Sequence, residues 1–152
     1  MKHSKQKGNL GFSSTLKELH KLGLNVFTEL GDNSRIDLIV EVSRSLVTLQ
    51  VKYATEKPNS VILPLRKCGP NGYRYTYVKE DIDVFSVYLP VKDKTIFIPA
   101  KLACQNASSF TVRFEESKNH QTNGIHTIQE FENLEKILND VLKLRNASVT
   151  QR

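Results

Sequence analysis

The chain has 152 residues, of which 39% are hydrophobic and 25% are charged. This length suits one domain of ~100 to 200 residues, and the composition excludes an intrinsically disordered chain. No apolar run reaches the ~18 residues of a membrane span, so we expect an intracellular protein without a membrane partner. The net charge of +6 favours an anionic partner.

The excess charge is confined to one half of the chain. Residues 1–80 hold 13 Lys or Arg and 7 Asp or Glu, which gives +6, whereas residues 81–152 hold 9 of each. Any anion-binding surface should therefore come from the first half. The two cysteines and four histidines lack the close spacing of zinc ligands, which argues against a structural zinc or a disulfide scaffold. We expect the cysteines to be buried free thiols.

Apolar periodicity predicts the element order helix, strands, helix. Leucines near the N-terminus recur every third residue, and the last third of the chain again has apolar residues at helical spacing. Between them, apolar and polar residues alternate as in strands, and Gly69-Pro70-Asn71-Gly72 marks a turn. The predicted elements are a basic tail at 1–7, helices at 10–22 and 127–144, strands at 25–29, 36–42, 47–53, 61–66, 84–89, 95–99 and 110–114, and a frayed tail at 146–152. We interpret this order as a single α+β domain over 1–152.

The segments 36–42 and 47–53 are predicted to form a β-hairpin. Pairing their apolar residues toward a core places Leu38 opposite Val51 and a tight turn at 44–45. The same register places Asp37 opposite Lys52 on the other face.

Polar side chains converge on that other face, because Gln50 lies diagonal to Asp37 at a cross-strand reach of ~5 to 8 Å. The Asp37 carboxylate, the Gln50 side-chain oxygen and the Val51 backbone carbonyl are ligands suited to Mg²⁺ or Mn²⁺. A metal there could act on a phosphodiester, with Lys52 stabilising transition-state charge or positioning or deprotonating a water. The alternative is a cross-strand salt bridge between Asp37 and Lys52, worth ~0 to 1 kcal/mol.

Basic residues beside this hairpin are candidate DNA contacts. They lie in the N-terminal tail, just before the hairpin, and around the 69–72 turn, where three tyrosines alternate with them. A two-stranded ribbon fits the major groove, and Arg or Lys can address guanine there. The alternative for Tyr73, Tyr75 and Tyr77 is packing in a core or a subunit interface. The predicted DNA contacts are Lys5, Lys7, Arg35, Arg66, Lys67 and Arg74.

Three segments carry a resemblance to a known family. They are Lys7-Gly8-Asn9-Leu10-Gly11 before a helix, Gly31-Asp32-Asn33-Ser34-Arg35-Ile36-Asp37-Leu38, and Gln50-Val51-Lys52. Together they resemble the PD-(D/E)XK nuclease superfamily. More narrowly, the chain is similar to small bacterial homing endonucleases encoded in group I introns of cyanobacteria.

The resemblance implies a restriction-endonuclease-like core with a mixed central sheet flanked by helices. It implies a Mg²⁺-dependent (or Mn²⁺-dependent), site-specific DNA endonuclease that makes a double-strand break. Asp37 would be the metal-binding aspartate, Gln50 would replace the usual glutamate, and Lys52 would be the catalytic lysine. The glutamine removes a negative charge, so metal affinity should be lower or depend more on substrate phosphate. Phe12 stands where relatives often have glutamate, which argues against a second metal or an outer-shell acid.

One such site cuts one strand, so a double-strand break in DNA requires at least two chains. We therefore expect a homo-oligomer, a dimer at least, and the homing relatives imply a dimer of dimers. The expected location is the cytoplasm, at the nucleoid when bound to DNA. Two other functions stay open: a structure-specific nuclease resembling Holliday-junction resolvases, and a DNA-binding protein whose nuclease site has decayed.

Overall fold

The computed structural model describes residues 3–31, 33–105, 108–120 and 123–150. Its elements confirm the α+β class. The helices are α1 (Ser4–Lys21), α2 (Ala100–Ala103) and α3 (Leu134–Thr150), with 3-10 turns η1 (Pro70–Gly72) and η2 (Ile128–Phe131). The strands are β1 (Asn25–Phe27), β2 (Leu38–Val42), β3 (Ser45–Tyr53), β4 (Ser60–Pro64), β5 (Arg66–Cys68), β6 (Arg74–Thr76), β7 (Val84–Leu89), β8 (Lys94–Pro99) and β9 (Ser109–Arg113).

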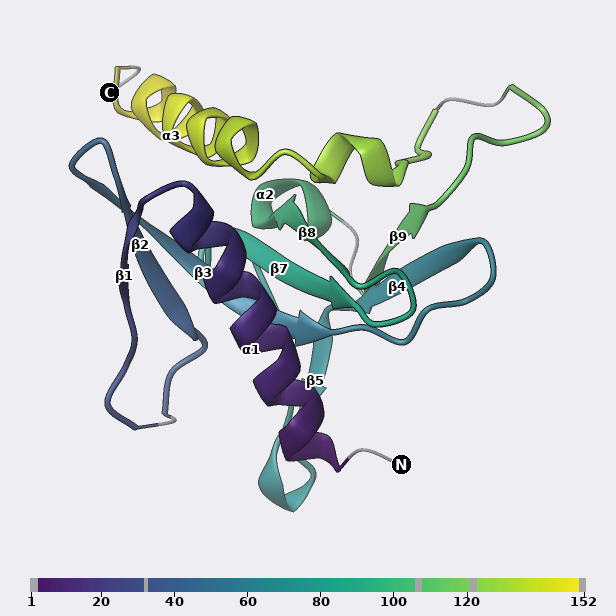
Figure 1. Ribbon diagram of the computed structural model, residues 1–152, viewed down its shortest axis with the longest axis horizontal. Helices are drawn as coiled ribbons and strands as arrows, with labels where there is room; N and C mark the ends of the chain where they lie inside the picture. The colour runs from purple at the N-terminus through teal and green to yellow at the C-terminus, as the bar shows by residue number, and fades with distance from the viewer. Residues whose placement is uncertain (1–2, 32, 106–107, 121–122, 151–152) are drawn as a thin grey trace.

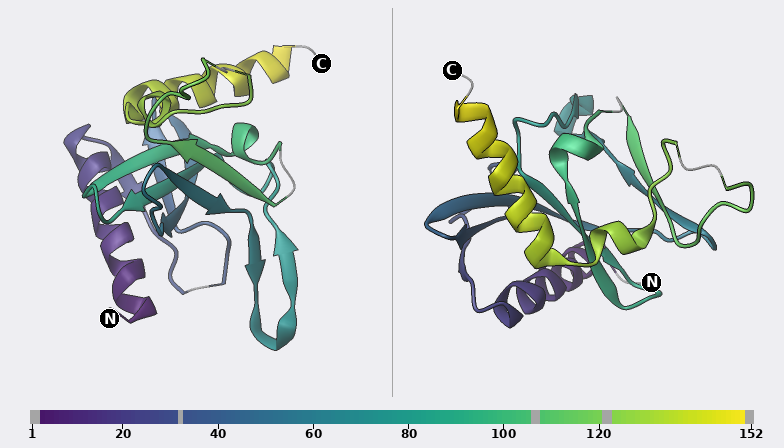
Figure 2. Two further views of the ribbon diagram at one scale, coloured as in Figure 1. Left: turned by 90° about the vertical axis from the view of Figure 1, so that its right-hand side faces the viewer. Right: turned by 90° about the horizontal axis from the view of Figure 1, so that it is seen from above.

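The central sheet has five strands in the order β1-β2-β3-β7-β8 (Figure 1). Of its strand pairs only β3–β7 is parallel, so the sheet is mixed, as the resemblance implied. Helix α1 packs across β3 and β7, whereas α3 packs along β8. The two long helices lie on different sides of the sheet (Figure 2). The pairs β4–β9 and β5–β6 form two small separate sheets.

Helix α1 approaches the sheet closely because a glycine faces it. A Cβ atom on the buried Gly11 would lie 3.3 Å from the Val51 side chain. One turn later the Thr15 hydroxyl donates to the Gly11 carbonyl at 2.8 Å and shares a 2.6 Å hydrogen bond with Ser86 of β7. This contact fixes α1 against the sheet beside the strand that carries Gln50 and Lys52.

Helix α1 begins at Ser4, so the prediction of a basic tail over 1–7 is wrong for the described residues 4–7. The physical reason is a capping box at His3, whose backbone N–H donates to the Gln6 side chain at 3.1 Å. Lys5 and Lys7 are therefore helical residues. Residues 1–2 lie outside the described ranges.

The β2–β3 hairpin forms with the predicted faces but not with the predicted register. Leu38 pairs with Leu49 instead of Val51, a shift of two residues that leaves each side chain on its expected side. The turn is at Ser43 and Arg44 instead of 44–45, and both residues have positive φ, at 48° and 66°. Two consecutive left-handed residues are typical of the tightest hairpin loop.

The predicted C-terminal helix is split and longer than expected. Thr127 and Glu130 form a capping box around η2, and the Asn133 side chain then accepts from the Lys136 backbone N–H as α3 starts. The helix continues to Thr150, so the frayed tail predicted from 146 is wrong for 146–150. Arg145 anchors this end by donating to Asp83 at 2.9 Å. Residues 151–152 lie outside the described ranges.

The strand predicted at 61–66 is divided, because β4 ends at Pro64 and the chain changes sheet before β5 starts at Arg66. Both cysteines are free, but Cys68 is exposed on β5 and Cys104 is half-buried, so the expected burial of both thiols is wrong. Cys68 lies on a two-stranded hairpin, which has no core to bury it. None of the helices within the described ranges has the length and apolar character that crossing a bilayer requires.

Candidate active site

Asp37 directly precedes β2 and closes the end of the β2–β3 ladder with its side chain. Its backbone N–H donates to the Leu49 carbonyl at 2.9 Å, as a strand residue would. Its carboxylate then accepts from the Val51 backbone N–H at 2.7 Å. The side chain thus replaces a backbone acceptor, which fixes the carboxylate against the middle of β3.

Gln50 lies on β3 on the same face as Asp37 and is almost fully buried, with 7% of its surface exposed. Its amide nitrogen donates to the Asp37 carboxylate at 2.5 Å and lies 3.4 Å from the Val51 carbonyl oxygen. Its amide oxygen accepts from the Tyr77 hydroxyl at 3.1 Å. The amide therefore bridges Asp37 and Tyr77.

Lys52 follows two residues later on the same face, as the period of two requires. Its ammonium lies over the Tyr77 ring, 4.7 Å from the centroid, and 3.4 Å from the Tyr77 hydroxyl. Burial, with a smaller effect from Lys67, lowers the Lys52 pKa to about 8, although the Asp37 carboxylate opposes this shift. Lys52 is thus electrostatically coupled both to Asp37 and to Lys67.

Tyr77 is the residue on which these contacts converge. Only 1% of its surface is exposed, and its ring packs edge-on against Phe85 with centroids 5.4 Å apart. Its hydroxyl accepts from Tyr75 at 3.3 Å in addition to Lys52, and it donates to Gln50. Burial is the main cause that raises the Tyr77 pKa, so the phenol stays protonated at working pH.

The tyrosine row therefore runs from the core outward. Tyr77 is buried, Tyr75 is half-buried, and Tyr73 is 65% exposed near the tip of the β5–β6 hairpin. The alternative of core packing holds for Tyr77. Sequence reasoning did not assign Tyr77 to the site, although the period-two alternation of the tyrosines already indicated a shared face.

Arg35 lies beside this network but is already engaged. It forms an ion pair with Asp81, and its guanidinium stacks over the Tyr75 ring at 4.3 Å from the centroid. The Asp81 carboxylate also accepts from the Val78 backbone N–H at 2.9 Å. Arg35 thus holds the segment before Asp37 against the chain that follows β6. In the Gly31-Asp32-Asn33-Ser34 segment that precedes Arg35, Asp32 lies outside the described residues.

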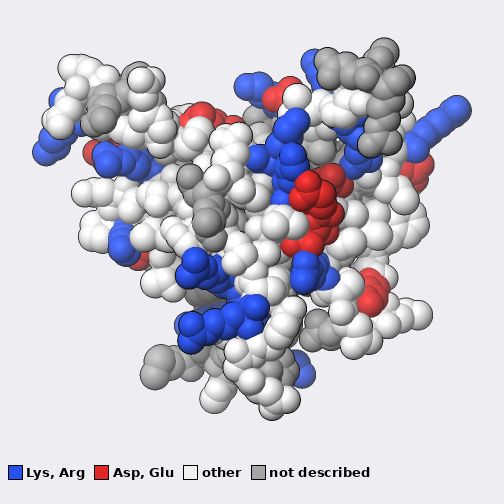
Figure 3. Space-filling view, turned by 180° about the vertical axis from the view of Figure 1, so that it is seen from behind, with Lys and Arg blue, Asp and Glu red and all other residues white. Residues whose placement is uncertain are grey.

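The remaining predicted DNA contacts fall in two places. Arg66, Lys67 and Arg74 are exposed on the β5–β6 hairpin, which projects beyond the sheet (Figures 1 and 2). Seen from behind, on the side away from α1, one group of Lys and Arg side chains lies in the lower part of the molecule, toward the end that carries this hairpin, and other Lys and Arg side chains lie over the upper part (Figure 3).

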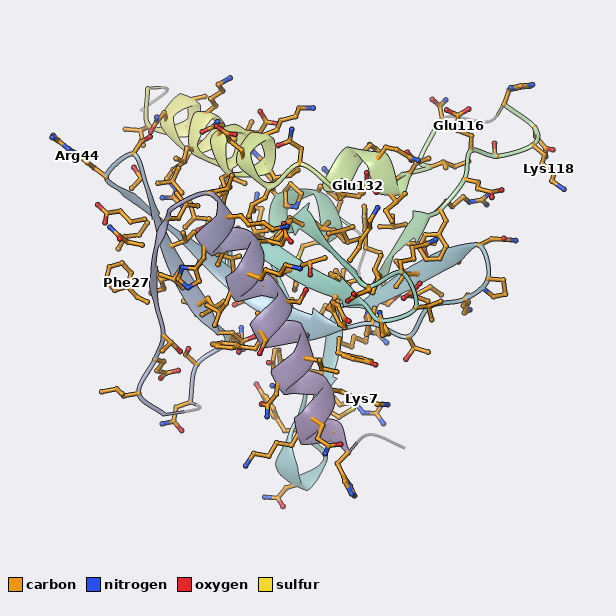
Figure 4. The ribbon with its side chains drawn as sticks, in the orientation of Figure 1. Lys7, Phe27, Arg44, Glu116, Lys118 and Glu132 are labelled. Carbon is orange, nitrogen blue, oxygen red and sulfur yellow. The ribbon has the colours of Figure 1, made fainter. Side chains whose placement is uncertain are left out.

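Lys5 and Lys7 lie elsewhere, on α1. Lys7 is 5.7 Å from the centroid of the Tyr53 ring, and Tyr53 alternates with Lys52 along β3, so it points to the opposite face of the sheet. Figure 4 shows Lys7 on the first turns of α1. The structure does not bring these two lysines to the Asp37 face.

Phe12, at the position where the resemblance often has glutamate, packs against the hydrophobic core. Phe12 therefore has a packing role, and the acid that relatives often have at this position is absent.

The arrangement around Asp37 fits a divalent cation that prefers oxygen ligands. The partly positive Gln50 amide nitrogen occupies the point between the Asp37 carboxylate and the Val51 carbonyl, where a cation would meet the same two oxygens. One carboxylate, one carbonyl and one amide suit an ion that keeps several waters. Among the described residues, no group of three or more His, Cys, Asp or Glu gathers as a fuller metal cage.

The mixed sheet thus has an aspartate directly before β2 and Gln-x-Lys on the neighbouring strand β3. The family model described as PD-(D/E)XK endonuclease matches residues 2–134, so the chain belongs to the PD-(D/E)XK endonuclease family. Family membership supports nuclease function and implies a DNA substrate, and nucleases of this family typically use divalent metals.

A solved structure described as a bacterial homing endonuclease, I-Ssp6803I, is similar with a TM-score of 0.68. The sequences are 19% identical, and the match covers 99% of both chains. At this identity the likeness shows the fold alone. A comparison with curated proteins found no match.

Proposed function

We propose that this protein is a metal-dependent, site-specific DNA endonuclease of the homing type that makes a double-strand break as a homo-oligomer. The observation that carries the proposal is the convergence of Asp37, the Gln50 amide and the Val51 carbonyl beside Lys52. The homing type is supported by the similarity to the homing endonuclease I-Ssp6803I, which extends over 99% of both chains.

Asp37, the Gln50 side-chain oxygen and the Val51 carbonyl would hold Mg²⁺ or Mn²⁺. A cation bound there supplies Lewis-acid stabilisation of charge on a phosphoryl group. The Val51 N–H keeps the Asp37 carboxylate in place at 2.7 Å, so this ligand is positioned before any cation binds. The strand ladder around it provides the rigidity that a preorganised site needs.

Lys52 is the residue that would act on the reacting group. Hydrolysis adds water to phosphorus and breaks the bond to one sugar oxygen, so negative charge develops on oxygens that an ammonium can stabilise. With a pKa of about 8, Lys52 is mostly protonated at pH 7. The minority of chains with a neutral Lys52 amine can accept a proton from water.

The β5–β6 hairpin would provide the contact with duplex DNA. Arg66 and Arg74 lie on one face of the ribbon, while Lys67 pairs with Tyr75 on the face that leads to the site. A two-stranded ribbon of this kind fits the major groove. Lys5 and Lys7 on α1 remain predicted contacts with a more distant part of the DNA.

The test is cleavage of a plasmid library that carries randomised duplex inserts, with Mg²⁺, followed by sequencing of the ends. A site-specific endonuclease should give paired breaks at one family of sequences. Asp37→Asn and Lys52→Met should each lower the rate by at least about a thousandfold while thermal unfolding shows a folded protein.

Other outcomes would assign one of the two alternative functions. Cleavage of four-way junctions in preference to every linear duplex would indicate a resolvase-like nuclease. Tight binding to DNA with no strand break in Mg²⁺ or Mn²⁺ would indicate a decayed site and would contradict the proposal.

A further inference from the structure

The Gln50 side chain directs its amide nitrogen, not its amide oxygen, toward the proposed cation site. Its nitrogen faces Asp37 and the Val51 carbonyl, while its oxygen faces the Tyr77 hydroxyl. An amide nitrogen only donates, whereas a hard cation requires the oxygen. Cation binding therefore requires the amide to rotate by about half a turn, which brings its nitrogen toward Tyr77.

Tyr77 can serve both orientations because a phenol donates and accepts hydrogen bonds. In the present orientation its hydroxyl donates to the Gln50 oxygen at 3.1 Å. After rotation its oxygen can accept from the Gln50 nitrogen, and its own proton can turn to the Tyr75 oxygen, 3.3 Å away. The pair of hydroxyls thus reverses its direction when the amide does.

We propose that Tyr77 is a positioning residue for cation binding, which holds the buried Gln50 amide in its rotated, oxygen-inward orientation. The inference rests on the proposed function of Asp37 and Gln50 as cation ligands and goes beyond it by assigning a role to a buried tyrosine outside the proposed ligand set. Tyr77 is almost fully buried and lies between Gln50 and Lys52, as this role requires.

Removal of the Tyr77 hydroxyl affects the two orientations of the Gln50 amide unequally, so the direction of the change in cation affinity can be predicted. In a Tyr77→Phe protein the Lys52 ammonium, 3.4 Å from the wild-type hydroxyl oxygen, can donate to the Gln50 oxygen in its place. An ammonium cannot accept, so it cannot satisfy the rotated Gln50 nitrogen. The cation-bound form alone then keeps a buried donor without a partner, so the variant should bind cations more weakly than the wild type.

The experiment is titration of the full-length chain with Mn²⁺ alone, with free Mn²⁺ measured by electron paramagnetic resonance. Tyr77→Phe should weaken Mn²⁺ binding about tenfold. Tyr88→Phe is the matched control, because it removes the hydroxyl of another mostly buried tyrosine, and that hydroxyl donates to Asp93 at 2.8 Å. It should bind Mn²⁺ as the wild type does, whereas Asp37→Asn should lose the site.

Two further variants separate positioning from a general loss of structure. In Gln50→Glu an oxygen faces the cation in either orientation, so adding Tyr77→Phe should change Mn²⁺ affinity by less than about twofold. Tyr75→Phe keeps the Tyr77 hydroxyl but removes the acceptor for its reversed proton, so it should also weaken Mn²⁺ binding.

Different results would overturn different parts of the proposal. If the wild type binds no Mn²⁺ in an Asp37-dependent manner, the proposed metal site fails, and the role of Tyr77 fails with it. If binding depends on Asp37 but Tyr77→Phe matches the wild type, only the positioning role is wrong. An equal loss in the Gln50→Glu background would show that Tyr77 acts through the fold and would also reject the inference. If Tyr77→Phe does not fold, the test depends on Tyr75→Phe. A Tyr75→Phe protein that binds Mn²⁺ as tightly as the wild type would then reject the inference.

Discussion

The buried position of Lys52 in the sheet destabilises its charged form and thereby the folded protein. The Lys52 pKa is about 8 in the folded protein and about 10.5 in an unfolded chain, mainly because burial penalises the charged form. The unfolded chain therefore binds more protons between these two pH values, so the free energy of unfolding rises as the pH increases from 8 to 10.5. Below pH 8 the full penalty is present.

Lys52→Met should therefore stabilise the protein at pH 7 by about 1 to 3 kcal/mol while it abolishes cleavage. Urea unfolding at pH 7 and at pH 10 measures this directly. The gain should shrink by more than half at pH 10, where the penalty of burying the charge has mostly been relieved. Lys143→Met, on the exposed side of α3, is the control and should change little at either pH. A variant less stable than the wild type at pH 7 would contradict this account.

The chemistry of individual site residues could be predicted from the sequence, but their contacts could not. Alternation along β3 is enough to place Gln50 and Lys52 on one face. No local pattern reports that Asp37 would close the ladder through its side chain, or that Tyr77 would meet Gln50 across 27 positions of sequence. Those contacts depend on how β6 returns to the sheet, which is a tertiary property.

At the scale of elements, the β2–β3 hairpin shows why faces are easier to predict than register. A shift of two residues leaves every side chain on its side, so hydrophobic alternation cannot distinguish the two registers. The turn decides between them, and the usual signal for two left-handed residues is Asn-Gly. Ser43 and Arg44 adopt that conformation without the signal, and Arg44 projects from the tip (Figure 4).

The β5–β6 hairpin projects from the sheet, so its exposed cations are available for DNA (Figure 2). A triple variant with glutamine at Arg66, Lys67 and Arg74 should weaken binding to a non-specific duplex. The slope of log affinity against log salt should become shallower by about 0.9 for each phosphate that the variant no longer neutralises. Fluorescence anisotropy between about 50 and 200 mM salt, without divalent cations, measures that slope.

The matched control removes the same charge from surfaces distant from the hairpin, with glutamine at Lys118, Lys136 and Lys143. It should keep a slope close to that of the wild type, apart from a general electrostatic effect. Equal slopes for the two triple variants would mean that the hairpin does not contact the DNA backbone.

At the scale of the whole molecule, the excess positive charge, the candidate active site and the β5–β6 hairpin come from the same half of the chain. The first 80 residues carry the entire excess charge, and they also contain Asp37, Gln50, Lys52 and the β5–β6 hairpin. The remaining strands and α3 complete the sheet and its covering layer. The order of strands in the sheet could be inferred only through the family resemblance, because the parallel β3–β7 pair joins segments that no local pattern connects.

One Asp37 site per chain sets a condition on the whole assembly, because a duplex has two strands of opposite direction. Two copies related by a twofold axis would present one site to each strand. Mixed oligomers, purified through different tags on wild-type and Asp37→Asn copies, should therefore nick a plasmid that contains the selected target. Wild-type oligomers should linearise it.

Gel separation of nicked and linear plasmid reports the outcome, and sedimentation of the same samples distinguishes two copies from four. In a dimer, each mixed particle has one working site, so nicked circles should be the end product. In a dimer of dimers, the nicked share should rise with the proportion of Asp37→Asn copies. Complete linearisation by a mixed dimer, or by a particle with the mass of a single chain, would show that one site cuts both strands in turn and would remove the requirement for an oligomer.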